Sequence, residues 1–495
     1  MFNGTKVRII FESIHLTKAK STTTYTIDNY ATFVIFTYNS FVFSIINVTL
    51  DENIIHLSIS CIMNKHLLSA IILFLLISCQ QGNKKDQGLL FEINVEEGIN
   101  NKVDKLLLSD AAMDIDIIPL ETTDSCLISR IRNLVIGEND LFINNFYTIL
   151  RFDKTGKFRT VITKKGDAPA NIAASSGLGI DDRAKLVHVA NSFGFHNEIK
   201  TYRYDGTWVN TIHPARPGEA LFGTMNWDER TYNFFNGKHI IRRILPLQDG
   251  SKDNWQIGIL DVNGKVLAHF YDPKILRYQK DIDSNNSGQS IDRIRYAWGT
   301  ESPVQNRYFN HVNFMFETND TIYRYSEKNN TLKPRYVMQC GKRPDAEATY
   351  ILGKESGYFQ YIFAFDLLEA KDYLYIDVEK DRSAFLLRVD KQDGSIQSLE
   401  LEGEIVDGAM TKYRKVDAPH FTNDLCGGLP FYPTSTNERQ WLCAYNSFDL
   451  LEQIDIEKLK QTKVLLPEKR DQLVKILENL KDDDNPVVMV ATLKY

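Results

Sequence analysis

The chain has 495 residues, of which 43% are hydrophobic and 25% are charged. These proportions are typical of a globular protein and exclude a disordered, collagen-like or disulfide-dense chain. The formal net charge of −6 argues against a nucleic-acid-binding protein, which carries a clear basic excess. The aromatic content is high, with 28 Phe, 23 Tyr and 5 Trp, and favours β-structure.

Residues 1–62 differ in composition from the rest of the chain. They hold no proline and 8 charged residues, whereas 113 of the 417 residues from Cys79 onward are charged. Residues 31–50 carry no charge over 20 residues, which is long enough to span a bilayer. They are rich in Phe, Thr, Ser and Asn, however, and make a poor spanning helix. We interpret residues 1–62 as a non-native upstream extension, with Met63 as the true start and a transmembrane segment as the alternative.

Residues 63–78 have the layout of an export signal. A short cationic segment, Met63–His66, precedes an apolar run of 11 residues at 67–77, which is too short for a permanent membrane span. The run ends in Leu76-Ile77-Ser78-Cys79, which resembles the lipobox of bacterial lipoproteins. An ordinary cleaved signal followed by an incidental cysteine is the alternative.

The lipobox resemblance implies that Cys79 becomes the lipidated first residue of the mature protein. We therefore expect an exported protein that is anchored by lipid to the cell envelope, at the outer membrane. Whether it faces the periplasm or the cell surface stays open. Residues 79–110 then form a tether and lead-in to the folded body, beginning with the polar stretch 80–87.

From about residue 115 the sequence repeats one unit: a strand, a tight turn and a second strand. Alternating apolar and polar residues predict half-buried strands, and an Asp/Asn-Gly step provides the positive φ of a hairpin turn. The turns fall at Gly156, Gly206, Gly264, Asn330 and Gly394, which are 50, 58, 66 and 64 residues apart. This period suits a four-stranded propeller blade with long loops and gives between five and six blades.

A second type of strand precedes each hairpin, and a sixth copy follows the last one. We expect these to be inner or second strands of the blades: 141–144, 186–190, 239–242, 312–316, 373–377 and 441–445. A β-sandwich is the alternative, but it needs two or three domains, and the sequence shows no linker between them. A single closed ring explains the period without one.

The C-terminal part departs from the repeat. Residues 450–482 have helical periodicity interrupted by Pro467, and a strand-like run follows at about 486–494. We expect that run to rejoin the last blade, together with the early strand at 114–120, because joining both ends in one blade removes an open sheet edge. The prediction is an all-β fold: one six-bladed β-propeller at 111–495 with a short helical insertion near the C-terminus.

Several of these stretches resemble a family of six-bladed β-propeller lipoproteins from Gram-negative gut bacteria, whose blade layout is similar to that of NHL-type propellers. The matching segments are 117–123, 149–158, 319–324 with 332–336, 421–431 and 484–488. The chain departs from the family at Lys165–Pro169, where a Gly-rich turn is usual, and at Cys426, where an Asp is usual. The resemblance implies no catalytic residues.

The segment 421–433 is the candidate ligand loop. Asn423 and Asp424 are short polar residues beside Gly427 and Gly428, which let a backbone approach closely. They either present polar groups at the channel mouth or form a turn held by Asx hydrogen bonds and aromatic packing, and the turn is the favoured interpretation.

Metal and disulfide sites have weak sequence support. Seven histidines remain after residue 79, without H-E-x-x-H, His-x-His or i,i+4 pairs, so we expect no metal and no cofactor. Cys426 and Cys443 either pair as a disulfide or stay as buried free thiols.

Charged and aromatic clusters are interpreted as structural. The basic pairs Lys164-Lys165 and Arg242-Arg243 predict solvated faces rather than phosphate sites. Trp208, Trp227 and Trp298 suit packing between blades better than stacking on sugars.

The function favoured by the sequence is non-enzymatic. We expect a monomeric binding or scaffold protein that offers its channel face to a glycan, a peptide or a partner protein of the envelope. The alternative is a propeller hydrolase or lyase acting on an extracellular carbohydrate or lactone, with paired carboxylates in the channel. The fold alone does not decide between them.

Overall fold

The computed structural model describes four strands between residues 8 and 59, and then residues 90–191, 198–214, 232–242, 255–272, 304–316, 319–342, 360–407 and 412–495. The chain divides into two compact units, Met1–Leu89 and Leu90–Tyr495.

The first unit holds one antiparallel sheet. Its strands are β1 (Arg8–Ile10), β2 (Ile27–Ile35), β3 (Ser44–Asp51) and β4 (Ile54–Ile59). Parts of the uncharged stretch 31–50 thus lie in β2 and β3. Within the described parts of the chain, no helix is long and apolar enough to cross a membrane. The predicted signal segment and Cys79 lie outside the described residues.

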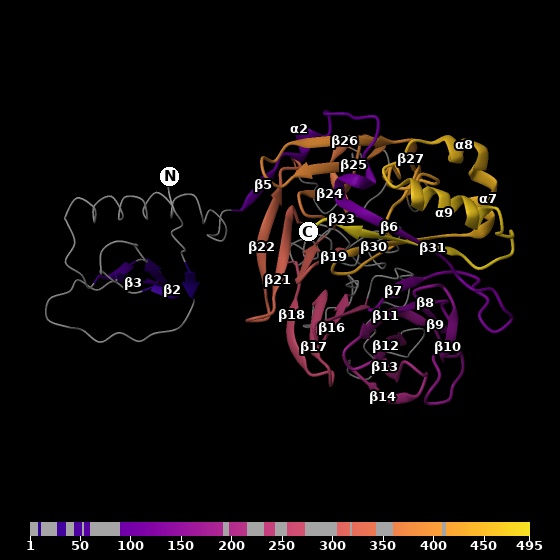
Figure 1. Ribbon diagram of the computed structural model, residues 1–495, viewed down its shortest axis with the longest axis horizontal. Coiled ribbons are helices and arrows are strands. Elements are labelled where there is room, and N and C mark those ends of the chain that lie inside the picture. The colour runs from indigo at the N-terminus through magenta and orange to yellow at the C-terminus, as the bar shows by residue number, and fades with distance from the viewer. Residues whose placement is uncertain are drawn as a thin grey trace, which may run out of the picture. The chain divides into compact units, whose positions relative to one another are not determined.

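The second unit is a ring of six β-sheets, which confirms the predicted six-bladed propeller (Figure 1). Blade 1 is β7 (Asn133–Ile136), β8 (Asp140–Asn144), β9 (Ile149–Asp153) and β10 (Phe158–Thr163). Blade 2 is β11 (Ser175–Asp181), β12 (Leu186–Asn191), β13 (Glu198–Arg203) and β14 (Trp208–Ile212). Blade 3 is β15 (Tyr232–Phe235), β16 (Lys238–Arg242), β17 (Ile257–Asp261) and β18 (Val266–Phe270).

The other three blades have the same antiparallel order, but the fourth strand of blade 6 comes from the start of the propeller. Blade 4 is β19 (Val304–Tyr308), β20 (His311–Met315), β21 (Thr321–Ser326) and β22 (Thr331–Met338). Blade 5 is β23 (Phe363–Glu369), β24 (Tyr373–Lys380), β25 (Ser383–Asp390) and β26 (Ile396–Leu401). Blade 6 is β29 (Ser435–Thr436), β30 (Gln440–Tyr445), β31 (Val487–Leu493) and β6 (Ala112–Pro119). A separate hairpin, β27 (Gly403–Asp407) and β28 (Lys412–Val416), follows blade 5.

The turns that revealed the repeat join the third and fourth strands of blades 1 to 5. All five turn residues have positive φ: Gly156 (83°), Gly206 (88°), Gly264 (84°), Asn330 (51°) and Gly394 (79°). A side chain is strained in this region, and Gly and Asn tolerate it best. The predicted second strands correspond to β8, β12, β16, β20, β24 and β30.

Blade 6 is built from both ends of the ring. Strand β31 pairs with β30 on one side and with β6 on the other, with Val487 opposite Pro119 and Leu493 opposite Ala112. Since β6 precedes blade 1 in the chain and β31 is the last strand, this pairing closes the ring and leaves no unpaired strand between the two ends.

Residues 90–111 run along the outside of the ring before β6 begins. Strand β5 (Phe91–Ile93) adds in parallel to β22 of blade 4, and α2 (Val95–Gly98) follows it. Val103 N–H then donates to the Ser398 carbonyl of blade 5, and α3 (Leu108–Ala111) leads into β6. This segment therefore links blades 4, 5 and 6.

Three helices lie between β30 and β31. They are α7 (Ser447–Gln453), α8 (Ile456–Gln461) and α9 (Pro467–Leu477), and they gather beside β6 and β31 (Figure 1). Asp455 caps α8 by accepting from Lys458 N–H at 3.0 Å. Pro467 opens α9, where its missing N–H costs nothing.

The hydrophobic core is divided among the interfaces between blades. Between blades 1 and 2, for example, Phe142 and Ile149 pack against Leu178, Val187 and Tyr202. Apolar faces of neighbouring sheets thus bury each other, and the first strand of each blade faces the centre of the ring.

Candidate ligand-binding site in the central channel

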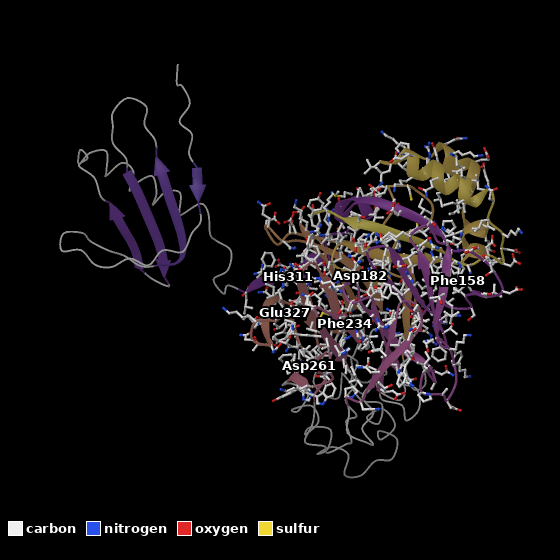
Figure 2. The ribbon with its side chains drawn as sticks, turned by 60° about the horizontal axis from the view of Figure 1, so that its bottom comes forward. Phe158, Asp182, Phe234, Asp261, His311 and Glu327 are labelled. Atoms are coloured by element: carbon white, nitrogen blue, oxygen red, sulfur yellow. The ribbon has the colours of Figure 1, made fainter. Side chains whose placement is uncertain are left out.

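A cavity of about 100 Å³ lies at the centre of the ring. Its lining takes residues from the first strand of all six blades, among them Asn133, Gly179, Asn233, Asn306, Asp366 and Ser435. Phe234 of β15 also lines it, and Figure 2 shows this residue nearer the middle of the ring than Phe158 or Glu327. Residues far apart in the sequence therefore meet at one site.

Two glycines let neighbouring blades approach closely beside the cavity. A Cβ at Gly177 would lie 2.7 Å from Tyr232 Cβ, and one at Gly179 would lie 2.5 Å from Phe234 Cβ. Both distances are far below van der Waals contact. The glycines of β11 thus allow β15 to pack against it, and this contact forms one wall of the cavity.

Amide side chains in the lining have hydrogen-bonding groups that the described residues do not satisfy. These groups are Asn133 Oδ1, Asn306 Nδ2 and both amide atoms of Gln305. Asn306 is 1% exposed. Because an unpaired buried polar group costs about 1–3 kcal/mol, these three amides are suited to hydrogen-bond a ligand.

Asn306 is held in place from the adjoining blade. Its Oδ1 accepts from the Glu369 N–H at 3.0 Å, so its donor group is the part left without a partner. The Glu369 carboxylate in turn accepts from Arg324, Lys391 and Asn313. Burial by itself raises the pKa of Glu369, but Arg324, Lys391 and the hydrogen bonds outweigh burial and lower it.

Two arginines and one carboxylate supply the charge of the described lining. Arg307 donates through Nη2 to Glu438 Oε1 at 2.7 Å and lies over the Phe235 ring. Arg242 is 2% exposed, so the prediction of a solvated basic face is wrong at this residue. It ends β16, where the strand turns it toward the cavity rather than toward solvent.

The Asp366 carboxylate is already engaged. It accepts from the Leu367 N–H at 2.9 Å and from the Tyr432 hydroxyl at 3.2 Å. Among the described lining residues it is the one carboxylate, and a histidine is not part of that lining. The arrangement thus offers hydrogen bonds and positive charge, and amides do not transfer protons at neutral pH.

The residues singled out in the predicted ligand loop, Asn423, Asp424, Gly427 and Gly428, lie outside the cavity lining, which takes Pro433 from the end of this segment. Asn423 is buried, and its Oδ1 accepts from the Cys426 N–H at 3.2 Å. Asp424 accepts from the N–H and the hydroxyl of Ser109. Gly427 and Gly428 have φ of 78° and 86° and lie under Leu459 and Leu473 of the helices, respectively. These contacts are those of the turn interpretation.

The four described cysteines are all free and buried: Cys126, Cys340, Cys426 and Cys443. The structure therefore contains no Cys426–Cys443 disulfide. Burial raises the pKa of Cys426 to about 11, and burial also raises the pKa of Cys443. Both thiols are consequently protonated at neutral pH.

In the described parts of the chain, neither a metal-binding group nor a tryptophan forms a second ligand site. No group of three or more His, Cys, Asp or Glu residues is arranged there to hold a metal ion. Trp208 is 40% exposed on β14, the outer strand of blade 2, so its predicted packing between blades is wrong. Trp227 and Trp298 lie outside the described residues.

The amides that line the cavity were not singled out from the sequence. Asn133, Gln305 and Asn306 lie on first strands, which carry no turn signal of their own. The signal that could have found them is a short run containing polar residues just before a predicted second strand, as in Val304-Gln305-Asn306-Arg307-Tyr308 before the strand at 312–316.

Comparisons with known proteins agree with the fold. The family model described as "Domain of unknown function (DUF4934)" matches residues 90–492, and no curated protein matches the chain. A solved structure from Bacteroides fragilis, of a protein named as exported, is similar over 82% of this chain and 100% of its own, with 13% identity and a TM-score of 0.50. A DUF4221 family member from Bacteroides vulgatus covers 61% of this chain and 87% of its own, with 12% identity and a TM-score of 0.35.

Proposed function

We propose, for a chain that belongs to the DUF4934 family, that the propeller is a binding protein and that its central channel takes the polar groups of a glycan. One observation supports this above all: the lining amides have donors and acceptors that the described residues leave unsatisfied. A sugar hydroxyl is itself both a donor and an acceptor. It therefore matches an Asn or Gln side chain better than a purely apolar or purely anionic group does.

The wall of the cavity also suits a sugar. Tyr232 and Phe234 contribute to the lining, and aromatic side chains give a site an apolar surface beside its polar groups. The small volume fits one end of a glycan chain rather than a long segment. Binding would place the terminal residue among the six first strands.

The lining amides are expected to contribute separately to affinity. Asn306→Leu keeps the shape of the side chain and Gln305→Leu shortens it by one atom. Both remove the hydrogen bonds of the amide, so each should weaken glycan binding about tenfold. A glycan array identifies the ligand, and isothermal titration calorimetry measures the affinity of each variant.

Asn479→Leu is the matched control, because Asn479 is an exposed amide after α9 that donates to the Lys475 carbonyl. It should leave the affinity unchanged. Glycan binding that survives both channel substitutions, or no glycan binding by the wild-type protein, contradicts the proposed function.

We also propose that the protein is exported and anchored by lipid at Cys79, with the NHL-type blade layout that its family resemblance implies. The order of cationic segment, apolar run and cysteine at 63–79 supports this. Export also fits the exported protein from Bacteroides fragilis, whose fold is similar.

Cys79→Ala should move the protein from the membrane fraction to the soluble fraction, because a lipid with several acyl chains holds a protein firmly. Immunoblots of the two fractions measure this, and mass spectrometry should find Cys79 as the modified first residue. Asn83→Ala, in the polar stretch that follows Cys79, is the control and should change nothing. Membrane retention of Cys79→Ala, or peptides from residues 1–62 in the mature protein, contradicts the anchor.

A further inference from the structure

The loop between β29 and β30 reaches from blade 6 to blade 4 at the edge of the cavity. Thr434 and Asn437 line the cavity, and the next residue, Glu438, contacts β19. The Phe309 N–H donates to the Glu438 carbonyl at 2.7 Å, and Arg307 pairs with the Glu438 carboxylate at 2.7 Å. Blade 5 lies between these two blades in the ring, so the loop crosses its inner edge.

The two partners of this ion pair differ in exposure. The Arg307 side chain is 18% exposed, whereas that of Glu438 is 45% exposed. An exposed carboxylate returns to water at little cost, since water solvates it well and the ion pair contributes little to stability. A buried guanidinium without any anion is far less favourable. Arg307 therefore requires an anionic partner, but that partner need not be Glu438.

Arg307 can also donate a hydrogen bond in addition to its ion pair with Glu438. Its Nε has no hydrogen-bond partner among the described residues, and neither has the Gln305 amide. Both residues line the cavity on β19. Since they are two positions apart on one strand, their side chains leave the same face about 7 Å apart. A cation and an amide at that spacing can contact opposite ends of one sugar ring.

We propose, on the basis of the function proposed above, that Arg307 selects glycans that carry a carboxylate, and that this carboxylate replaces Glu438 on the guanidinium. The ligand class is then an acidic sugar such as a hexuronic acid, with Gln305 on its hydroxyls. The exchange of one carboxylate for another keeps the charge around Arg307 balanced.

The test compares trigalacturonic acid with its methyl ester, which has the same ring hydroxyls and no charge, by isothermal titration calorimetry. The wild-type protein should bind the acid at least tenfold more tightly. Arg307→Gln should remove this preference. Glu438→Gln should strengthen binding of the acid about threefold to tenfold, because the competing carboxylate is gone, and should leave binding of the ester unchanged.

Three results overturn the inference. The first is equal affinity for the acid and the ester in the wild-type protein, Arg307→Gln and Glu438→Gln, which would make the channel a site for neutral glycans. An unchanged affinity of Glu438→Gln for the acid contradicts the proposal that the ligand carboxylate replaces Glu438. Because this result does not depend on Arg307→Gln, the test stays valid even if Arg307→Gln does not fold. Binding of a short peptide through its free C-terminal carboxylate, without binding of trigalacturonic acid, contradicts the assignment of an acidic sugar as the ligand. Loss of all binding in Gln305→Leu, by contrast, concerns the channel site itself.

Discussion

Replacing Glu369 with Gln is expected to lower the free energy of unfolding by about 3–5 kcal/mol. The Glu369 side chain is 2% exposed and contacts Arg324 at 2.8 Å and Lys391 at 3.0 Å. A neutral amide leaves both cations without an anion inside the protein. The loss is large because removing one member of a buried ion network leaves uncompensated charge.

The location of Glu369 explains why the effect should extend to the whole ring. Glu369 ends β23 of blade 5, while Arg324 on β21 and the Tyr336 hydroxyl on β22 belong to blade 4. The carboxylate thus joins two blades that meet largely through apolar side chains. Its loss weakens one of the interfaces on which closure of the ring depends.

Chemical denaturation followed by circular dichroism measures this loss. Glu327→Gln is the matched control, since Glu327 also joins two blades, pairing with Lys238 of blade 3 at 2.9 Å, but keeps a 31% exposed side chain. It should cost no more than about 1 kcal/mol. Similar losses in the two variants would show that burial of Glu369 does not set its contribution.

The fold was predictable because its signals are local. Each of the five turns between Gly156 and Gly394 depends on one residue with positive φ, which a short Asp/Asn-Gly pattern indicates. The strands beside the turns are indicated by alternating apolar and polar residues. The closure of blade 6 was also predictable from the strand-like runs at 114–120 and about 486–494, since each needs a partner strand, and the two pair in the structure.

The candidate site was not predictable because its residues meet only in the closed ring. Asn133 and Asn306 lie on blades 1 and 4, and no spacing in the sequence relates them. Arg242 was mispredicted for the same reason. Two adjacent arginines in the sequence indicate an exposed basic pair, but the position of β16 in the closed ring buries Arg242. In the loop at 421–433, by contrast, the polar side chains are engaged within the protein, Asn423 with the Cys426 N–H and Asp424 with Ser109.

The stability of the propeller is expected to fall by about 4 kcal/mol between pH 7 and pH 5. Two buried histidines at the interface of blades 2 and 3 cause this. His188 lies 3.1 Å from the Thr201 hydroxyl and His239 lies 2.8 Å from the Tyr232 hydroxyl, and their rings are 5.0 Å apart. Burial, with the neighbouring His239, lowers the pKa of His188 to about 3. Burial also lowers the pKa of His239 to about 4, against weaker opposing contacts.

The sign follows from which state binds more protons. Both histidines have a pKa near 6.5 in the unfolded chain and stay neutral when folded, so the unfolded state takes up protons first as the pH falls. Their contribution to stability is fully present above about pH 6.5, and it is lost progressively as the pH falls toward 4 for His239 and 3 for His188. Most carboxylates are still ionised at pH 5, so the interval from pH 7 to 5 isolates the histidines.

Urea denaturation at half-unit steps of pH measures the dependence. His188→Gln and His239→Gln retain a hydrogen-bonding group that does not titrate, so each should remove about half of the slope that this pair causes, whatever its effect on stability at pH 7. The pKa of His311 is also lowered, mainly by burial, so part of the slope remains in both variants. His213→Gln is the control, because the His213 side chain is 69% exposed, and it should keep the full slope. A free energy of unfolding that stays constant from pH 7 to 5 in the wild-type protein would mean that the folded state accepts these protons as readily as the unfolded chain. The two imidazoles would then not be buried as neutral groups between the blades.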